Sequence, residues 1–385
     1  MTYALTAAPI AILCVGMGWF PLAPSGLSRY VYELAHALAA QSDRVDLCGV
    51  DMPDRADQEN LTLFNLASST QKLPQRLWQM KQYYKSRSNL TFNVVNLHFA
   101  LYGFPLLQFL PKDVPVIFNF HGPWALESQW EGGSQRSTWL KKWLERRVYA
   151  RCDRFVVLST AFGTILHEHY DVPWEKIHII PGGVHTTKFQ PNLTRTAARS
   201  QLNIPSDRKI LFTPRRLVHR MGLDKLISAM VQVKQVVPDI YLVIAGKGPL
   251  REPLEEQVIQ LGLQDHVKFL GFIPDEDLPI AYQAADLTVM PSQGLEGFGL
   301  ALAESLACGT PAICTPIGGM PDVLSPLNPN LVTQGTDTDS IALKIIEMLT
   351  VSDALPSRSD CRHYAVEQFD WQSIAQQVRQ VMLMS

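Results

Sequence analysis

Residues 293–309 read QGLEGFGLALAESLACG, a glycine-interrupted loop that runs directly into a helix whose other positions are almost wholly apolar. A short apolar run at 287–290 precedes the stretch, and another follows at 312–315. A strand, a loop, a helix and a further strand in that order predict one unit of a parallel sheet. Glycines let the backbone approach a ligand closely, and the N–H groups at a helix N-terminus attract anions. The stretch therefore predicts an anion-binding loop in an α/β fold.

The same alternation runs along the whole chain. The expected strands are Ile10–Val15, Val45–Val50, Val94–Leu97, Val116–Phe120, Phe155–Leu158 and Ile177–Ile180, and then Ile210–Thr213, Tyr241–Ala245, Val267–Leu270, Leu287–Met290, Ala312–Thr315 and Asn330–Val332. A chain of 385 residues exceeds what one core usually supports. We expect two Rossmann-like domains, residues 1–192 and 193–385, whose parallel sheets face a central cleft. The last helix, about 366–385, can stay on the second domain or pack back on the first.

Composition narrows the class of protein. Hydrophobic residues make up 46% of the chain and the formal net charge is -2, so we expect a globular enzyme without a nucleic-acid partner. The six cysteines show no C-x-x-C spacing, which argues against a disulfide framework or a structural zinc site and favours the cytoplasm. The apolar run 8–20 lacks a basic flank and a cleavage signature, so we interpret it as a buried strand.

Two groups of charged residues need partners. Glu304 lies among apolar neighbours, where an unpartnered carboxylate would be costly, so we expect it to bond to the hydroxyls of a ribose or to an internal Arg or Lys. Arg215, Arg216 and Arg220 lie within six positions. Guanidinium groups suit phosphate because they offer several donors in one plane. Arg215 is as well explained by solvation or by pairing with Asp or Glu.

A longer pattern adds a family resemblance. Glu296, Gly297, Phe298, Gly299 and Glu304, followed by Cys308–Pro311 and Gly318–Gly319, resemble the signature of the family 4 retaining glycosyltransferases (glycosyl transferases group 1), which have the GT-B fold. The segment Pro181–Val184, with Phe189 and Pro191, is similar to the one that closes that family's first domain. Gly182 and His185 depart from its usual Asn and Asp, and Met221 replaces its usual lysine.

The resemblance implies roles for individual residues. His121 and Glu296 would be catalytic, and the donor would be bound by Gly26, Arg216, Arg220, Lys247, Phe298, Gly299, Leu300 and Glu304. Arg220, next to Met221, could substitute for the missing lysine. From the residues alone, His121 could equally be a structural histidine, and Gly26 could merely follow a helix cap.

Cofactor use is expected to be absent. Gly246-Lys247-Gly248 follows a strand, but Arg251 occupies the place of the third glycine of a dinucleotide fingerprint, so we expect no nicotinamide cofactor. No convincing Asp-x-Asp pair is present for a metal. The stretch 139–154 places Trp139, Leu140, Trp143, Leu144 and Val148 on one helical face, which is interpreted as core or, alternatively, as a face that rests on a membrane.

These observations predict a metal-independent, retaining glycosyltransferase that moves a hexose from a UDP- or GDP-linked donor to a hydroxyl of a glycan, lipid or small molecule. The expected location is the cytoplasm, with peripheral association at the inner face of a membrane as an option. Two alternatives stay open: a sugar-nucleotide epimerase of similar architecture, and a nucleotide-binding protein that has lost transfer. The acceptor should contact 51–90 and 122–138, which match no motif.

Overall fold

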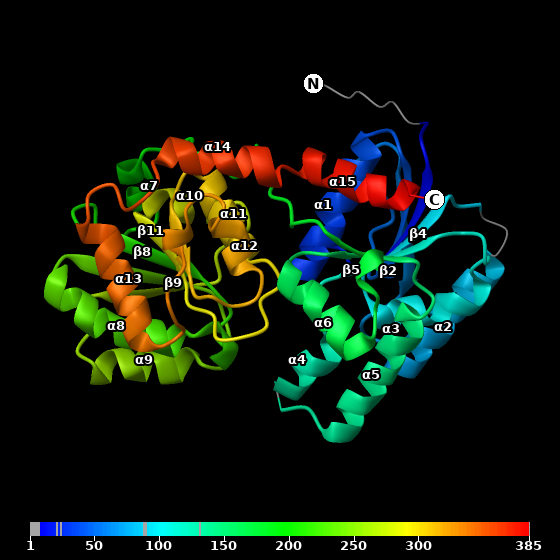
Figure 1. Cartoon of the computed structure of the whole chain (residues 1–385), viewed down its shortest axis with the longest axis horizontal. Helices are drawn as coiled ribbons and strands as arrows, with labels where there is room; N and C mark the ends of the chain where they lie inside the picture. Colours follow the sequence, from blue (N-terminus) through cyan, green and yellow to red (C-terminus); the bar gives the residue numbers. More distant parts are fainter. Residues whose placement is uncertain (1–7, 21, 24, 88–90, 131, 385) are drawn as a thin grey trace. The chain divides into compact units, whose positions relative to one another are not determined.

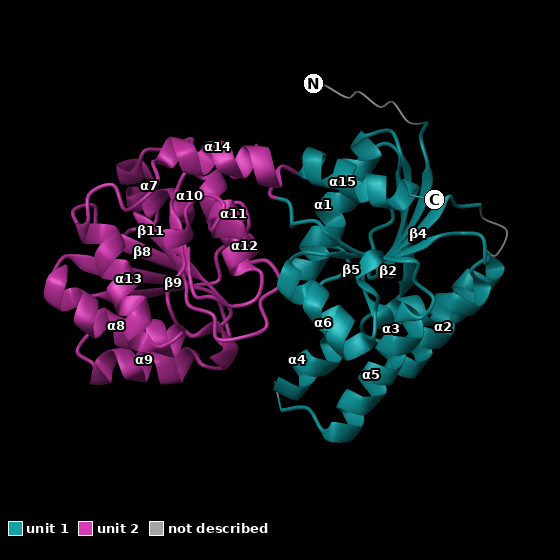
Figure 2. Ribbon diagram, viewed as in Figure 1, with its two compact units in different colours: residues 1–183, 371–385 teal, residues 184–370 magenta. Residues whose placement is uncertain are grey.

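The computed structural model describes residues 8–20, 22–23, 25–87, 91–130 and 132–384. The chain forms two compact units (Figure 2): unit 1 contains the residues up to Gly183 together with those from Trp371 onward, and unit 2 contains Val184–Asp370. Residues 1–7 and Ser385, which the predicted domains include, lie outside the described residues.

The division falls after Gly183 rather than after residue 192, and local contacts explain the difference. Val184 forms a β-bridge with Asp370, and the Phe189 ring lies against Tyr282 with ring centroids 6.1 Å apart. Residues 184–192 are therefore part of the second core.

Unit 1 is built on a seven-stranded parallel sheet of order β3-β2-β1-β4-β5-β6-β7 (Figure 1). Its strands are β1 (Ala11–Gly18), β2 (Arg44–Val50), β3 (Leu61–Ala67), β4 (Val94–Leu97), β5 (Val116–Phe120), β6 (Arg154–Val157) and β7 (Ile177–Ile179). Its helices are α1 (Gly26–Ala40), α2 (Leu73–Ser86), α3 (Ala100–Gly103), α4 (Trp124–Trp130), α5 (Gln135–Tyr149), α6 (Thr160–Tyr170) and α15 (Trp371–Leu383), with 3₁₀ turns η1 (Phe104–Phe109) and η2 (Trp174–Lys176). Every residue of β4 and β5 is buried, because helices cover both faces.

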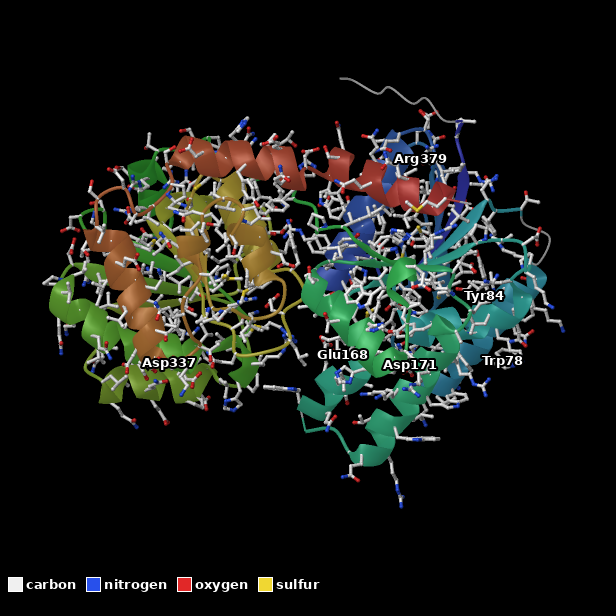
Figure 3. All side chains as sticks on the ribbon, in the orientation of Figure 1. Trp78, Tyr84, Glu168, Asp171, Asp337 and Arg379 are labelled. Carbon is white, nitrogen blue, oxygen red and sulfur yellow. The ribbon has the colours of Figure 1, made fainter. Side chains whose placement is uncertain are left out.

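The C-terminal helix α15 belongs to unit 1, where it packs beside α1 (Figure 1). Arg379, labelled in Figure 3, fixes it there: its Nε lies 2.6 Å from a carboxylate oxygen of the fully buried Asp43. The chain thus returns to its first domain only after α14, at Trp371.

Unit 2 contains a five-stranded parallel sheet of order β10-β9-β8-β11-β12. Its strands are β8 (Lys209–Pro214), β9 (Ile240–Ala245), β10 (Val267–Gly271), β11 (Leu287–Met290) and β12 (Ala312–Cys314). Its helices are α7 (Arg195–Gln201), α8 (Leu223–Val236), α9 (Arg251–Gln260), α10 (Leu278–Ala284), α11 (Leu300–Ala307), α12 (Met320–Leu324), α13 (Thr338–Thr350) and α14 (Arg358–Phe369), with 3₁₀ turns η3 (His219–Met221) and η4 (Pro329–Leu331).

The predicted strand at Asn330–Val332 is wrong. Pro329 opens the 3₁₀ turn η4, which the Asn328 side chain caps by accepting a hydrogen bond from the Asn330 backbone, and only Val332 makes a bridge to Cys314. Conversely, the stretch 51–90 that matched no motif contains β3 and α2. Within the described ranges, no helix has the length and apolar character needed to cross a membrane.

Candidate functional site

The candidate donor site lies at the carboxyl edge of the sheet in unit 2. The chain leaves β8 toward β9 on one side and reaches β11 on the other, so the order of strands reverses between β8 and β11. Ligands of open α/β sheets bind outside the carboxyl ends of the strands at such a point. The two loops that begin there, 215–222 and 291–299, contain four of the eight residues predicted to bind the donor, namely Arg216, Arg220, Phe298 and Gly299.

Backbone contacts hold these loops in place. Gly222 has a φ of 68°, and a Cβ there would overlap the carbonyl oxygen of Pro291. Gly318 has a φ of 57°, and a Cβ would overlap the carbonyl oxygen of Glu296. Only glycine fits both requirements, a left-handed conformation and a close approach. The loops after β8, β11 and β12 are thereby joined backbone to backbone.

The three arginines have three different environments. Arg215 lies 3.0 Å from a carboxylate oxygen of Glu296, and their side chains are 9% and 15% exposed. Arg220 donates from Nη1 to the carbonyl oxygen of Leu295 at 3.1 Å, so it supports the loop. The exposed side chain of Arg216 has no hydrogen-bond or salt-bridge partner among the residues that the structure describes. Met221, which stands in the place of the family lysine, is 5% exposed, so Arg216 is the exposed member of the arginine group.

Glu304 is buried in α11, where it is 4% exposed. Its Oε2 accepts a hydrogen bond of 2.7 Å from the Tyr282 hydroxyl of α10. The sequence reasoning considered a ribose or an internal cation as the partner and missed this phenol. Hydrogen bonding to a carboxylate reduces the cost of burying it, so Tyr282 explains how the helix accommodates Glu304.

The N-terminus of α11 completes this edge. Gly299 caps the helix with a φ of 82°, and Leu300 is its first residue. Phe298 is 5% exposed and its ring lies 5.6 Å from the ring of Phe369, which anchors the turn. The first N–H groups of a helix have no partner within it. Lys247 is exposed on the loop after β9, with its Nζ 5.2 Å from the centre of the Phe272 ring.

Gly26 opens α1 in unit 1. The Ser25 hydroxyl caps the helix by accepting a hydrogen bond of 3.0 Å from the Ser28 backbone. A Cβ added at Gly26 would meet nothing within 4 Å. No steric contact among the described residues therefore requires a glycine at this position.

A chain of buried polar groups ends at His121. The Tyr30 hydroxyl donates to Asn119, which donates to Asn96. Asn96 donates to Nε2 of His98 at 3.0 Å, and Nδ1 of His98 lies 3.1 Å from Nε2 of His121. Since Nε2 of His98 accepts a hydrogen bond, the proton of the neutral His98 ring is on Nδ1. This Nδ1–H group donates to Nε2 of His121. His121 therefore carries its own proton on Nδ1.

Burial keeps both imidazoles neutral. It lowers the pKa of His121 from 6.5 to about 3 and holds the pKa of His98 well below its usual value, with the His121 charge as a smaller cause for His98. His98 is 2% exposed and His121 is half-buried. The pair follows β4 and β5 and so lies at the carboxyl edge of the sheet in unit 1. It can offer a neutral donor but not a readily protonated base.

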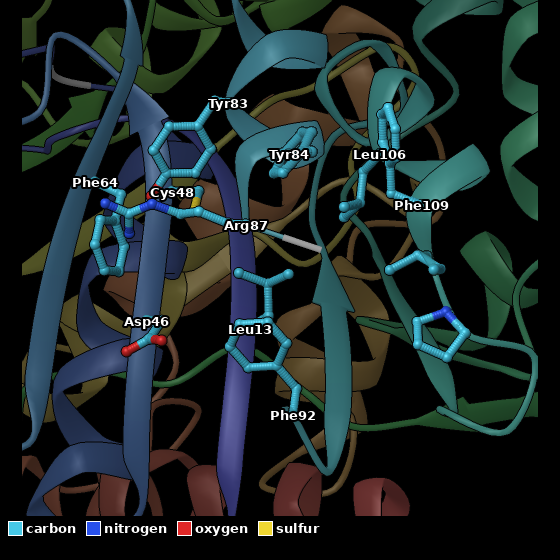
Figure 4. Close-up of a pocket in the computed structure, with 12 residues that line it drawn as sticks. Leu13, Asp46, Cys48, Phe64, Tyr83, Tyr84, Arg87, Phe92, Leu106 and Phe109 are labelled. Carbon is cyan, nitrogen blue, oxygen red and sulfur yellow. The ribbon is translucent and has the colours of Figure 1, made fainter. Parts of the chain in front are cut away.

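A pocket in unit 1 lies away from these residues (Figure 4). Leu13 and Asp46, which line it, are in the amino-terminal halves of β1 and β2, whereas the histidines follow the carboxyl ends of β4 and β5. Burial raises the pKa of Asp46. Among the described residues, no group of three or more His, Cys, Asp and Glu side chains is arranged to hold a metal ion.

Comparison with known proteins agrees with this arrangement. Residues 24–188 match the model of Glycosyltransferase Family 4, and residues 194–368 match the model of Glycosyl transferases group 1. The chain is 32% identical over 212 residues to a GDP-mannose-dependent alpha-(1-6)-phosphatidylinositol monomannoside mannosyltransferase from Mycolicibacterium smegmatis, a match that covers 52% of this chain and 54% of that protein. It is 28% identical over 303 residues to a D-inositol 3-phosphate glycosyltransferase from Corynebacterium urealyticum, covering 75% and 70%.

Solved structures show the same fold. The sucrose-phosphate synthase of Thermosynechococcus elongatus superposes with a TM-score of 0.80 at 24% identity, covering 97% of this chain and 98% of that one. The predicted fold class, GT-B with two parallel-sheet α/β domains, is confirmed. Since the two family models together match nearly all of the chain from residue 24 to 368, the chain belongs to the family 4 glycosyltransferases with a group 1 domain.

Proposed function

We propose that the protein transfers a hexose from a nucleoside diphosphate sugar to a hydroxyl of a glycan, lipid or small-molecule acceptor. The observation that carries this proposal is the exposed Arg216 beside the β8–β11 reversal, within the segment that matches the group 1 model. The donor is proposed to be GDP- or UDP-linked. The mycobacterial relative is named for its use of GDP-mannose, which supports a GDP-linked donor and a product in glycolipid synthesis.

The donor diphosphate would bind at the carboxyl edge of unit 2. Arg216 supplies a permanent positive charge, Lys247 a second one, and the N–H groups from Phe298 to Leu300 supply donors. Negative charge builds on the diphosphate as the bond to the anomeric carbon breaks, so these groups stabilise the transition state more than the ground state. Arg220 would act through the loop that it holds, by positioning Leu295 and its neighbours.

Glu296 and Glu304 would make polar contacts to the donor. Glu296 is oriented by Arg215 and would accept hydrogen bonds from hydroxyls of the transferred sugar. Glu304 is oriented by Tyr282 and would accept hydrogen bonds from hydroxyls of the ribose. Both are carboxylates held by a neighbour, which is the preorganisation that a donor site requires.

We propose that the reaction retains the anomeric configuration. The acceptor oxygen bonds to the anomeric carbon on the face that the diphosphate leaves, and the hydroxyl proton passes to a diphosphate oxygen. His121, neutral and protonated on Nδ1, donates a hydrogen bond to the sugar rather than accepting that proton. Gly26, with open space at its Cα, allows the backbone of α1 to approach the donor.

The positive charge for this step comes from side chains, so we propose that no metal or other cofactor is needed. We place the reaction in the cytoplasm, because all six cysteines are buried and free of disulfides. Buried Met221, in place of the family lysine, favours one alternative, a nucleotide-binding protein without transfer.

A transfer assay tests the function. Labelled GDP-mannose, UDP-glucose and UDP-galactose are incubated with the protein, with and without an extract of lipids and glycans, in buffer that contains EDTA. Acceptor-dependent release of nucleoside diphosphate, with equal label in the product, supports the proposal. Label that stays on the nucleotide, epimerised or unchanged, with every donor and extract overturns it.

A further inference from the structure

One face of α5 in unit 1 exposes large apolar side chains. Trp139 is 68% exposed, Leu140 is 55% exposed and Trp143 is 38% exposed. Arg136, on the same helix, is exposed as well. The interpretation of this stretch as core is therefore wrong for its tryptophans, although Leu144 is buried as expected. Large apolar groups gathered in one place on a soluble protein mark a binding surface.

The exposed residues form a single band along the helix. Successive residues of a helix are 100° apart, so the exposed positions 136, 139, 140, 143, 146 and 147 fall within an arc of about 120°. The band, called the α5 face, consists of Arg136, Trp139, Leu140, Trp143, Arg146 and Arg147. Leu144 and Val148 lie outside this arc and pack into the core. The α5 face is thus a contiguous surface of aromatic, aliphatic and arginine side chains.

The charge of α5 is strongly positive. The sequence of the helix, QRSTWLKKWLERRVY, contains five basic residues and one acidic residue. That acid, Glu145, is 1% exposed and accepts a hydrogen bond of 2.8 Å from the Tyr170 hydroxyl inside the core. Along the fully described helix, no acid therefore reaches the surface. Asp171 of the α6 cap offsets only Arg146, at 3.0 Å.

Helix α4 supports α5 on the side that carries Lys141. Trp130 ends α4, is 59% exposed, and belongs to a helix that packs against α5. Lys141 of α5 lies 4.9 Å from the centre of the Trp124 ring of α4 and donates to the Ser128 hydroxyl, so these contacts hold α5 against α4. The surface is held by the fold rather than created on binding.

The combination of arginine and tryptophan side chains on the α5 face distinguishes a membrane from a protein as its binding partner. A protein partner would have to bury Arg136 and Arg147 among the tryptophans, and a buried cation is costly unless a matching anion is supplied at each position. The interface of an anionic bilayer supplies phosphates at the depth where tryptophan rings also bind. We propose that the α5 face docks unit 1 on the surface of a membrane that contains anionic lipids.

Flotation of the full chain with vesicles tests this. The wild-type protein is expected to float with vesicles of phosphatidylcholine and phosphatidylglycerol, and not with phosphatidylcholine alone. Replacing Arg136 and Arg147 by Gln should weaken binding about fivefold per arginine, which corresponds to about 1 kcal/mol for each basic residue near an anionic surface. Trp139→Ser with Trp143→Ser should weaken it further, because the rings no longer bury in the interface.

Trp78→Ser is the matched control, since Trp78 is 62% exposed but lies on α2. Circular dichroism of each variant verifies that it folds. The proposal is overturned if wild type does not bind anionic vesicles, or if the α5-face variants bind as well as Trp78→Ser. It is also overturned if light scattering shows a wild-type dimer that the α5-face substitutions dissociate without vesicle binding. Because these readouts need no sugar donor, they stand or fall independently of transfer activity.

Discussion

Nδ1 of His98 lies 3.1 Å from Nε2 of His121, and their rings are stacked with centroids 5.4 Å apart. Two adjacent imidazoles could not both be charged in this buried position. The hydrogen bonds from Asn96 fix which nitrogen of each ring holds the proton, and leave His121 with a donor at Nδ1. The sequence favours His121 at this position and offers His98, which ends the preceding strand, as a weaker candidate; the structure brings the two together as a pair.

The first prediction concerns tautomers. Both rings should be in the neutral Nδ1–H form, since each Nε2 accepts a hydrogen bond. Nitrogen chemical shifts of the imidazoles, assigned with His98→Gln and His121→Gln variants, measure this directly. An Nε2–H form of His121 would show that the hydrogen bond between the rings runs in the opposite direction. A charged ring near neutral pH would show that burial does not keep the pair neutral.

The second prediction concerns stability and pH. The pKa of each histidine is lowered in the folded protein, so the unfolded chain binds more protons as the pH falls below 6.5. The stabilising contribution is complete above pH 6.5 and is lost progressively toward pH 3, by up to about 1.4 kcal/mol per pH unit for each ring. Urea unfolding between pH 7 and 4 measures how the free energy of unfolding changes with pH. The same pH dependence in a His98→Gln, His121→Gln double variant would contradict the prediction.

The third prediction separates packing from ligand approach at Gly26. Gly26→Ala should leave the unfolding free energy unchanged or raise it by up to about 1 kcal/mol, because Ala favours the helix and its Cβ meets open space. Turnover should fall if the donor approaches the Cα. Urea unfolding and the transfer assay measure the two effects. Unchanged turnover of Gly26→Ala would mean that Gly26 merely follows the Ser25 helix cap and does not approach the donor.

The fourth prediction concerns the buried carboxylate. Tyr282→Phe should lower the unfolding free energy by about 1.5–3 kcal/mol, the usual value of a hydrogen bond to a charged group. Tyr241→Phe is the control in the same unit, because the described residues give its hydroxyl no hydrogen-bond partner. Equal stability of the two variants would mean that Tyr282 does not support Glu304.

Much of the fold follows from the sequence for a simple reason. Strands such as β5 and β11 are covered on both faces and read as short apolar runs, so their bounds were predicted without error. Strand β3 was missed, since exposed positions interrupt its apolar residues. The domain boundary was misplaced because the bridge between Val184 and Asp370 joins residues far apart in sequence.

The candidate site was predicted residue by residue, but its internal contacts were not. The pairing of Arg215 with Glu296 was open in the sequence, where Arg215 could equally have been solvated. Tyr282 gave no signal because α10 has no motif, and only the fold brings it to Glu304. The exposure of Trp139 could not be predicted, because helical periodicity identifies a face without telling which side is covered.

The central claim, that the carboxyl edge of unit 2 holds the donor diphosphate, is tested most directly by calorimetric titration with GDP and UDP. Wild type should bind one of them, and Arg216→Ala should weaken that binding at least about tenfold, a loss typical of one charged hydrogen-bonding group. Lys209→Ala, an exposed cation at the opposite end of β8, should bind as wild type does. Equal binding by the Arg216→Ala and Lys209→Ala variants would contradict the account.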